Sequence, residues 1–185
     1  MSAPVNMLGF AGSLRKNSYN KALLRAADEL VPTNAKLGIF DLLGIPPFNQ
    51  DLETQPPQKV KEFKARIRGA DAILIATPEY NYSIPGVLKN AIDWASRPPA
   101  DNAWEGKPVA IMGASTGRFG TARAQYHLRQ CFVGLDMHAV NYPEVMIAHA
   151  AQCFDDPGRL KDEKARELIA ELLQNLVDLT RKFQS

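Results

Sequence analysis

Apolar residues follow two rhythms along this chain: short continuous runs, and longer stretches in which they recur every three or four positions. The first rhythm predicts buried β-strands, and the second predicts amphipathic α-helices. The continuous runs predict strands over Val5–Ala11, Lys36–Asp41, Asp71–Thr77, Pro108–Ala114 and Met137–Asn141. A further short run over Val145–Ile147 can add to the fifth strand.

Helical spacing of apolar residues falls between these runs and after the last of them. It predicts helices over Lys21–Val31, Ile84–Ser96, Thr121–Phe132 and Asp162–Phe183, and one more that opens at Pro56 and Pro57. The Pro157-Gly158 pair predicts a turn before the last helix. Strands that alternate with helices are typical of an α/β fold with an open parallel sheet.

The run Asp71–Thr77 is apolar throughout rather than alternating. This pattern is typical of a strand in a parallel sheet that helices cover on both faces. A length of 185 residues fits one domain with a full core, so a single domain over residues 1–185 is expected.

Three polar loops follow the first, third and fourth predicted strands: Gly12–Asn20, Pro78–Ser83 and Ser115–Gly120. Right-handed crossovers place such loops at the carboxyl edge of the sheet, where folds of this class bind ligands. Because all three loops carry Gly, Ser or Asn, we expect them to form one site for an anion and a flat ring.

The first loop leads directly into a helix N-terminus, which leaves backbone N–H groups unpaired and favours negative charge. Ser13, Ser18 and Asn20 add neutral donors, and Arg15 adds a guanidinium that suits phosphate oxygens. An ordinary turn in which Ser18 merely caps the helix is the structural alternative.

The second loop carries a carboxylate and two aromatic side chains. Glu79 can act as a general base or accept hydrogen bonds within its loop. Tyr80 and Tyr82 can pack in the protein or stack beside a flat ring system.

Composition excludes several classes of protein. A hydrophobic fraction of 45% and a charged fraction of 23% are ordinary for a globular protein. The net charge of +2 and the lack of a long basic run argue against a nucleic-acid surface. No membrane-spanning run or signal peptide is recognisable, and Cys131 and Cys153 give no disulfide framework. We therefore expect a cytoplasmic protein.

Known catalytic and phosphate motifs are missing. The first loop is neither G-x-G-x-x-G nor G-x-x-x-x-G-K-[ST], although Asp41 stands where a ribose-binding acid would. Cys153 and Arg159 match C-x5-R only by count, since aspartates between them would repel a phosphate. The histidines lack ligand spacing, so no metal site is expected. Ser13 and Ser115 lack the G-x-S-x-G elbow of a hydrolase.

The loop Leu42–Asp51 is unusually apolar for an exposed connection. Its segment Ile45–Phe48 contains two prolines and is therefore stiff. We expect it to pack either on the edge of its own domain or on a partner subunit.

Two motifs carry a family resemblance. The first is Gly12-Ser13-Leu14-Arg15 with Ser18 and Asn20, and the second is the long stretch from Pro78-Glu79-Tyr80-Asn81 to Trp94. Together they resemble the NAD(P)H-dependent FMN reductase family, which includes bacterial quinone, azo and chromate reductases. The likeness extends over nearly the whole chain and implies a flavodoxin-like three-layer sandwich with a five-stranded parallel sheet.

The resemblance implies a set of FMN-binding residues in each loop. Ser13, Leu14, Arg15, Ser18 and Asn20 would hold the phosphate; Pro78, Glu79, Tyr80 and Asn81 would lie along the ring; Ser115, Thr116 and Gly117 would close its other side. It also implies a homodimer or homotetramer with the helix after the second motif at a subunit contact. Arg118 and Phe119 depart from the glycine-rich continuation that is frequent in relatives.

On this resemblance NADPH or NADH delivers a hydride to FMN, and the reduced flavin passes it to FMN, a quinone, an azo compound or a similar acceptor. The flavin carries the chemistry, so no catalytic acid or base is assigned. Two alternatives stay open: a one-electron FMN carrier, and a non-enzymatic module that uses the fold alone. The net charge of +2 argues against a carrier, because such proteins usually dock through an acidic surface.

Overall fold

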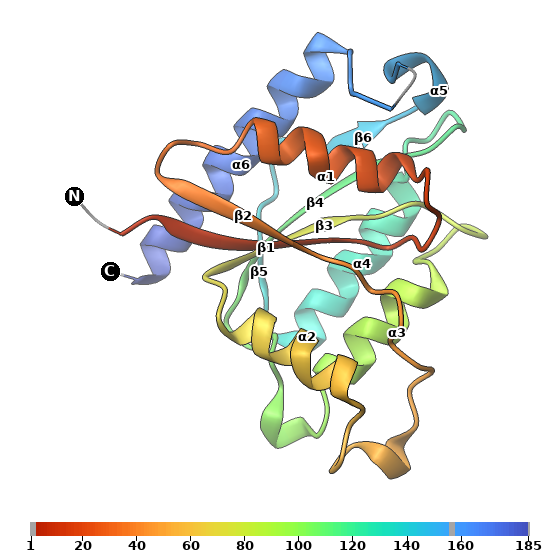
Figure 1. The fold of residues 1–185 in the computed structure, drawn as a ribbon. Coiled ribbons are helices and arrows are strands. Elements are labelled where there is room, and N and C mark those ends of the chain that lie inside the picture. Colours follow the sequence, from red (N-terminus) through yellow and green to blue (C-terminus); the bar gives the residue numbers. More distant parts are fainter. Residues whose placement is uncertain (1–2, 156–157, 185) are drawn as a thin grey trace.

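The computed structural model of the chain describes residues 3–155 and 158–184. Its centre is a parallel sheet with the strand order β2-β1-β3-β4-β5, in which β6 also pairs with β4 (Figure 1). The strands are β1 (Val5–Ala11), β2 (Ala35–Phe40), β3 (Ala72–Ala76), β4 (Pro108–Ala114), β5 (His138–Ala139) and β6 (Val145–Ile147).

Helices cover both faces of this sheet (Figure 1). The α-helices of the described residues are α1 (Tyr19–Glu29), α2 (Gln58–Arg68), α3 (Gly86–Ala95), α4 (Ala122–Leu135), α5 (Ala150–Cys153) and α6 (Glu163–Gln184). Short 3-10 turns η1 (Gln50–Leu52) and η2 (Pro99–Asp101) lie in the connections. One hydrophobic core lies between the sheet and α1 and α6, and the other between the sheet and α2, α3 and α4. This is the expected flavodoxin-like three-layer α/β fold.

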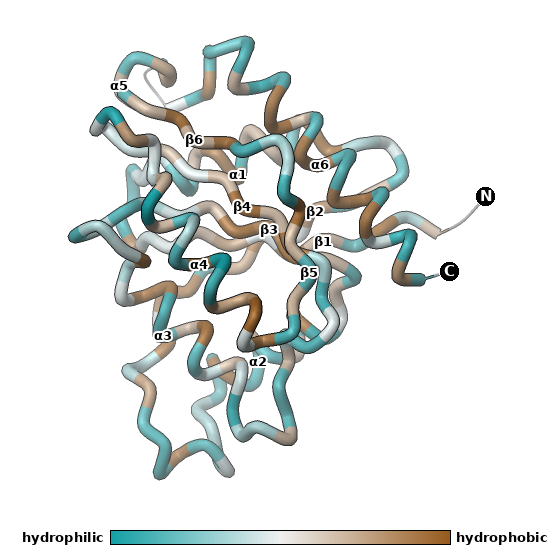
Figure 2. Tube along the Cα trace, turned by 180° about the vertical axis from the view of Figure 1, so that it is seen from behind, coloured by the Kyte–Doolittle hydropathy of each residue, from teal (hydrophilic) through white to brown (hydrophobic). Residues whose placement is uncertain are grey.

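The core follows from the apolar runs in the sequence. All residues of β3 and β4 are buried, and the brown stretches of Figure 2 concentrate on these central strands. Side chains of β1 point alternately to the two faces, so that Phe10 meets Phe63 of α2 edge-on with ring centres 5.3 Å apart. Aromatic pairs of this kind stabilise a core beyond their buried area.

Register brings the ends of the central strands to one level. Ala11 pairs with Ala76 of β3, and Ala76 pairs with Met112 of β4. The loops that leave β1, β3 and β4 therefore start side by side at the carboxyl edge of the sheet.

The edge of the sheet beside β4 differs from the expectation of one fifth strand, because two short strands lie there. These are β5 and β6, which both pair with β4 but are separated by a break at residues 140–144. Pro143 lies in that break and has no N–H for a ladder hydrogen bond, so the strand cannot run through it. The turn expected at Pro157–Gly158 includes Pro157, which lies outside the described residues.

The apolar loop after β2 packs on its own domain. Phe48 meets Trp94 of α3 edge-on with ring centres 5.0 Å apart, and the Trp94 indole N–H donates to the Pro46 carbonyl at 2.8 Å. Asn90 donates to the same carbonyl and accepts from the Phe48 N–H. Of the two alternatives for this loop, packing on the domain edge therefore accounts for Ile45–Phe48, while Leu43 stays 63% exposed.

Candidate functional site

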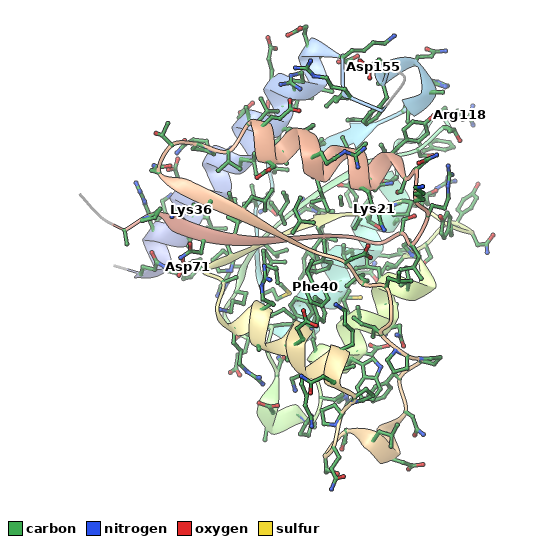
Figure 3. The ribbon with its side chains drawn as sticks, in the orientation of Figure 1. Lys21, Lys36, Phe40, Asp71, Arg118 and Asp155 are labelled. Atoms are coloured by element: carbon green, nitrogen blue, oxygen red, sulfur yellow. The ribbon has the colours of Figure 1, made fainter. Side chains whose placement is uncertain are left out.

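The loops at the carboxyl edge enclose a cavity of about 130 Å³. It lies at the end of the molecule where Figure 3 labels Lys21 and Arg118, opposite the end that carries Lys36 and Asp71. The sequence-predicted residues that line it are Ser13, Arg15, Ser18, Asn20, Pro78, Glu79, Tyr80, Ser115 and Thr116. Leu14, Asn81 and Gly117, the other predicted residues, lie in the same loops beside this lining.

The first loop prepares a helix N-terminus for an anion. Ser18 caps α1, since its hydroxyl accepts from the Asn20 N–H at 3.2 Å. The Ser13 hydroxyl accepts from the Arg15 N–H at 3.3 Å, and the Arg15 guanidinium donates to the Asn17 carbonyl at 3.3 Å. The guanidinium is thus held beside the positive end of α1, and a second hollow of about 560 Å³ adjoins it.

Asn20 has a role in the fold that its place in the motif did not reveal. Its side-chain amide donates to the Ala114 carbonyl at 3.0 Å, and its side-chain oxygen accepts from the Ala114 N–H at 3.0 Å. Asn20 is only 2% exposed, so these bonds are made away from solvent. They fasten the start of α1 to the end of β4, where the third loop begins.

The second loop forms a tight turn with unusual backbone geometry. Tyr80 and Ser83 exchange N–H···O=C hydrogen bonds of 3.2 and 3.0 Å, and the two residues between them have positive φ angles. The φ angle is 49° at Asn81 and 66° at Tyr82. Asparagine tolerates this left-handed region, whereas an aromatic residue rarely adopts it. The surrounding structure must therefore stabilise the turn.

The Glu79 carboxylate is engaged by α4. It accepts from the backbone N–H groups of Arg123 at 3.0 Å and Ala124 at 3.2 Å, and it pairs with the Arg123 guanidinium. The Glu79 side chain is 7% exposed. Neither sequence-based alternative describes this arrangement fully: the carboxylate accepts hydrogen bonds, as expected of one alternative, but its donors come from α4 and not from its own loop.

The third loop is fixed along β6 and the start of α5. The Ser115 N–H donates to the Ile147 carbonyl at 3.0 Å, and the Ser115 carbonyl accepts from the Ala150 N–H at 3.0 Å. Its hydroxyl accepts from the Gly117 N–H at 3.1 Å. These bonds hold Ser115–Gly117 as a rigid wall of the cavity.

Gly113 is required at the end of β4. A Cβ atom there would lie 1.9 Å from the Thr121 hydroxyl and 2.6 Å from the Thr77 carbonyl oxygen. Thr121 is buried with a φ angle of 75°, so it cannot move aside without disturbing the start of α4. The absence of a side chain at position 113 thus lets α4 approach the second and third loops.

Asp41 is committed to an ion pair. Its carboxylate lies 2.9 Å from the Lys21 ammonium. Burial opposes ionisation, but hydrogen bonds from Lys21 and the Leu43 N–H, together with the Lys21 charge, outweigh it and lower the pKa of Asp41. The carboxylate therefore stays ionised and paired at the position where a ribose-binding acid was considered.

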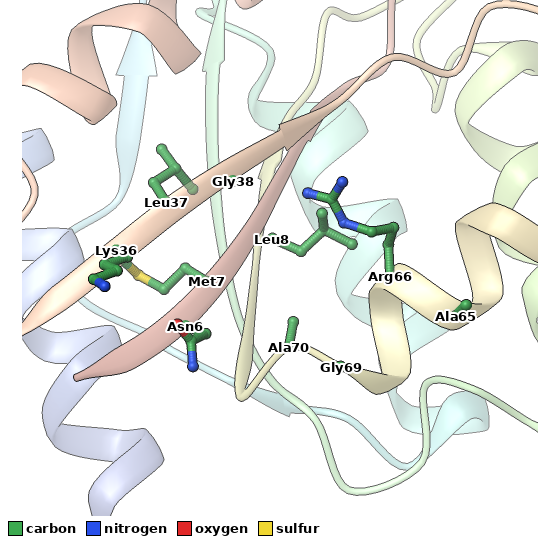
Figure 4. Close-up of a pocket in the computed structure, with 10 residues that line it drawn as sticks. All are labelled: Asn6, Met7, Leu8, Lys36, Leu37, Gly38, Ala65, Arg66, Gly69 and Ala70. Atoms are coloured by element: carbon green, nitrogen blue, oxygen red, sulfur yellow. The ribbon is translucent and has the colours of Figure 1, made fainter. Parts of the chain in front are cut away.

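A further hollow of about 430 Å³ lies at the amino ends of β1 and β2 (Figure 4). Arg66 of α2 extends over it toward Leu8 and Gly38. Open parallel sheets bind ligands at the opposite, carboxyl edge. We therefore do not treat this hollow as the candidate site. Arg66 is exposed and lies far from the carboxyl edge, so its substitution can serve as a control for substitutions in the three loops.

Sequence reasoning missed two residues of α4 that contact the second loop. Arg123 pairs with Glu79, and His127 Nδ1 lies 2.9 Å from the Ser83 hydroxyl. The only sequence signal was their spacing of four positions on one predicted helix, which places both side chains on one face. Their partners lie 44 residues away, a distance that local patterns do not reveal.

The described residues contain neither a membrane-length apolar helix nor a group of three or more His, Cys, Asp or Glu side chains placed to hold a metal ion.

The strand order and the polar loops at one sheet edge define a protein of the flavodoxin-like class. The family model for NADPH-dependent FMN reductase matches residues 5–152. An NAD(P)H-dependent FMN reductase of Pseudomonas aeruginosa is 58% identical over 185 residues, which are 100% of each chain. A quinone reductase of Pseudomonas putida is 44% identical over 164 residues, which are 88% of each chain.

A solved structure is also similar. The flavoenzyme FerB, an NAD(P)H:(acceptor) oxidoreductase from Paracoccus denitrificans, superimposes with a TM-score of 0.88 at 35% identity, covering 97% of this chain and 98% of its own. The chain belongs to the NADPH-dependent FMN reductase family. This confirms the expected oxidoreductase class, with FMN and NAD(P)H as its cofactors.

Proposed function

We propose that residues 1–185 form a single-domain, cytoplasmic FMN-dependent oxidoreductase that uses NAD(P)H to reduce small acceptors, quinones among them. The family supports the cofactor and the reaction class, and the quinone reductase relative supports the acceptor class. The observation that carries the proposal is the joining of three loops around one cavity beside the N-terminus of α1.

The FMN phosphate is assigned to the first loop. The start of α1 offers backbone N–H groups and the positive end of the helix dipole, and Arg15 adds a permanent charge beside them. Ser13 and Ser18 supply hydroxyl groups at the same cavity. We assign Asn20 a supporting role in this site, because its amide is occupied by Ala114.

The flavin ring is assigned to the space between the second and third loops. FMN supplies the hydride chemistry, while the chain binds and orients it. The turn of Pro78–Asn81 and the loop of Ser115–Gly117 are both tied down by backbone hydrogen bonds, so their remaining N–H groups keep a fixed direction. Fixed donors stabilise charge that develops on a bound ring without reorganising. Glu79 contributes its backbone to this wall, since α4 occupies its carboxylate.

We assign a homodimer or homotetramer to the working protein. Several large apolar residues are exposed in the isolated chain. Among the described residues, Leu43 is 63% exposed, Tyr82 is 68% exposed and Val133 is 84% exposed. Exposed apolar surface of this kind favours association. Light scattering should give a multiple of the 20.4 kDa chain mass, and a monomer with FMN bound would contradict the assignment.

Arg15→Ala tests the cofactor placement. Loss of a charge-assisted hydrogen bond should weaken FMN binding about ten- to hundredfold. Riboflavin lacks the phosphate and should lose far less affinity. Arg66→Ala, at the opposite end of the sheet, serves as the matched control and should leave both affinities unchanged. Equal losses for FMN and riboflavin in Arg15→Ala would contradict the placement.

A further inference from the structure

The second loop contains a turn that its own sequence does not favour. Tyr82 adopts a φ angle of 66°, and the residue is 68% exposed, so no buried packing of the ring compensates for the left-handed backbone. Unfavourable backbone conformations persist only where neighbouring groups hold them. Besides the backbone hydrogen bonds between Tyr80 and Ser83, the turn is contacted by side chains from one face of α4.

Arg123 supplies two of these contacts. Its guanidinium pairs with the Glu79 carboxylate at the beginning of the turn, and it lies 3.6 Å from the centre of the Tyr82 ring. A cation at this distance over an aromatic face is attracted to the ring. Arg123 thus contacts the turn at Glu79, before the strained residues, and at Tyr82, which is one of them. One helical turn further on, His127 contacts the Ser83 hydroxyl.

The same guanidinium also reaches the third loop. It lies 4.4 Å from the centre of the Phe119 ring, and the Arg118 guanidinium lies 4.6 Å from that ring. Arg123 therefore contacts both Tyr82 and Phe119, one aromatic residue from each of the two loops. Arg123 itself does not line the cavity between the loops.

We infer that Arg123 is a positioning residue for hydride transfer: it sets the spacing of the two loops that flank the flavin ring without touching the ring. This inference rests on the placement of FMN proposed above. The rate of hydride transfer depends steeply on the distance between the reacting atoms, so a small shift of either loop matters more for the rate than for binding. Lysine keeps the charge opposite Glu79 but lacks the planar guanidinium that lies over both rings.

The test compares Arg123→Ala and Arg123→Lys with the matched control Arg166→Ala, which removes an ion pair with Glu29 far from the loops. In Arg123→Ala we expect reduction of bound FMN by NADPH in stopped flow to slow about tenfold or more, while the dissociation constant of FMN changes less than about threefold. Arg123→Lys should recover part of the rate. Arg166→Ala should keep the parental rate.

A second readout does not depend on bound flavin. The amides of Tyr80 and Ser83 are hydrogen-bonded across the turn, so their hydrogen exchange in the protein without added FMN reports how well the turn is held. Arg123→Ala should speed their exchange about tenfold or more, with little change in the amides of β3 and β4.

Unchanged exchange of Tyr80 and Ser83 in Arg123→Ala would overturn the inference, as would an unchanged rate of reduction. Faster exchange throughout the sheet would also overturn it, because Arg123 would then act on global stability. Failure of the FMN placement gives a different result: Arg15→Ala would weaken FMN and riboflavin equally, whatever Arg123 does.

Discussion

Replacing Asn20 by alanine tests whether this residue holds the fold or holds the cofactor. Asn20 is 2% exposed and makes hydrogen bonds of 3.0 Å to both the N–H and the carbonyl of Ala114. Each buried group that loses its partner costs about 1–3 kcal/mol. Water from the adjacent cavity can pair with part of the exposed backbone, so we expect a loss of about 2–4 kcal/mol in the free energy of unfolding.

The assay is urea unfolding of the protein without added FMN, followed by titration with FMN and with riboflavin. Asn20→Ala should lower the free energy of unfolding and leave the ratio of the two affinities unchanged. Asn102→Ala is the matched control, since Asn102 also makes two backbone hydrogen bonds, to Trp104 at 3.1 Å and Leu135 at 3.2 Å. It should lower stability without changing flavin binding.

The opposite pattern would refute the reasoning. If Asn20 donated to the phosphate instead, Asn20→Ala would keep parental stability and lose FMN affinity by about 1.5–3 kcal/mol, with riboflavin unaffected. A selective loss of FMN with unchanged unfolding would therefore return Asn20 to the set of direct phosphate ligands.

Three further predictions concern stability. Ser18→Ala removes the cap of α1 and should cost about 1 kcal/mol in urea unfolding; no change would mean that the cap is dispensable. Gly113→Ala places a methyl group against Thr121 and should cost about 1–3 kcal/mol or more; parental stability would show that Thr121 can move aside. The hydrogen bond from Lys64, together with nearby positive charge, outweighs burial and lowers the pKa of Asp101 below its ordinary 3.8. Its stabilisation is present above about pH 4 and is lost as the pH falls through the lowered pKa, so Asp101→Asn should flatten acid unfolding there; an equally steep loss would contradict this.

The fold was predictable because its signals are local. Continuous apolar runs such as Asp71–Thr77 predict strands buried on both faces, and strand–helix alternation orders them in a parallel sheet. The carboxyl edge then follows from crossover handedness, which is why the three loops were expected to meet. The apolar runs Met137–Asn141 and Val145–Ile147 were recognised separately but assigned to one fifth strand, whereas the structure forms β5 and β6 there with a break at residues 140–144.

The partners of the site residues were less predictable, because they come from distant parts of the chain. Asn20 is 94 residues from Ala114, and Glu79 is 44 residues from Arg123. A motif indicates which residue types gather in a loop, but the direction of each side chain depends on tertiary packing. The motifs place Asn20 and Glu79 among the expected cofactor-binding residues, and only the structure shows that their side chains connect the loops to β4 and α4.

The central claim is that this chain binds FMN at the three loops and reduces it with NAD(P)H. Anaerobic stopped-flow mixing of the FMN-loaded protein with NADPH and, separately, with NADH tests it most directly. We predict complete loss of the oxidised flavin absorption with at least one of the two, followed by its return when a quinone is added. A flavin that dithionite reduces but that neither nicotinamide reduces would contradict the account and indicate an electron carrier instead.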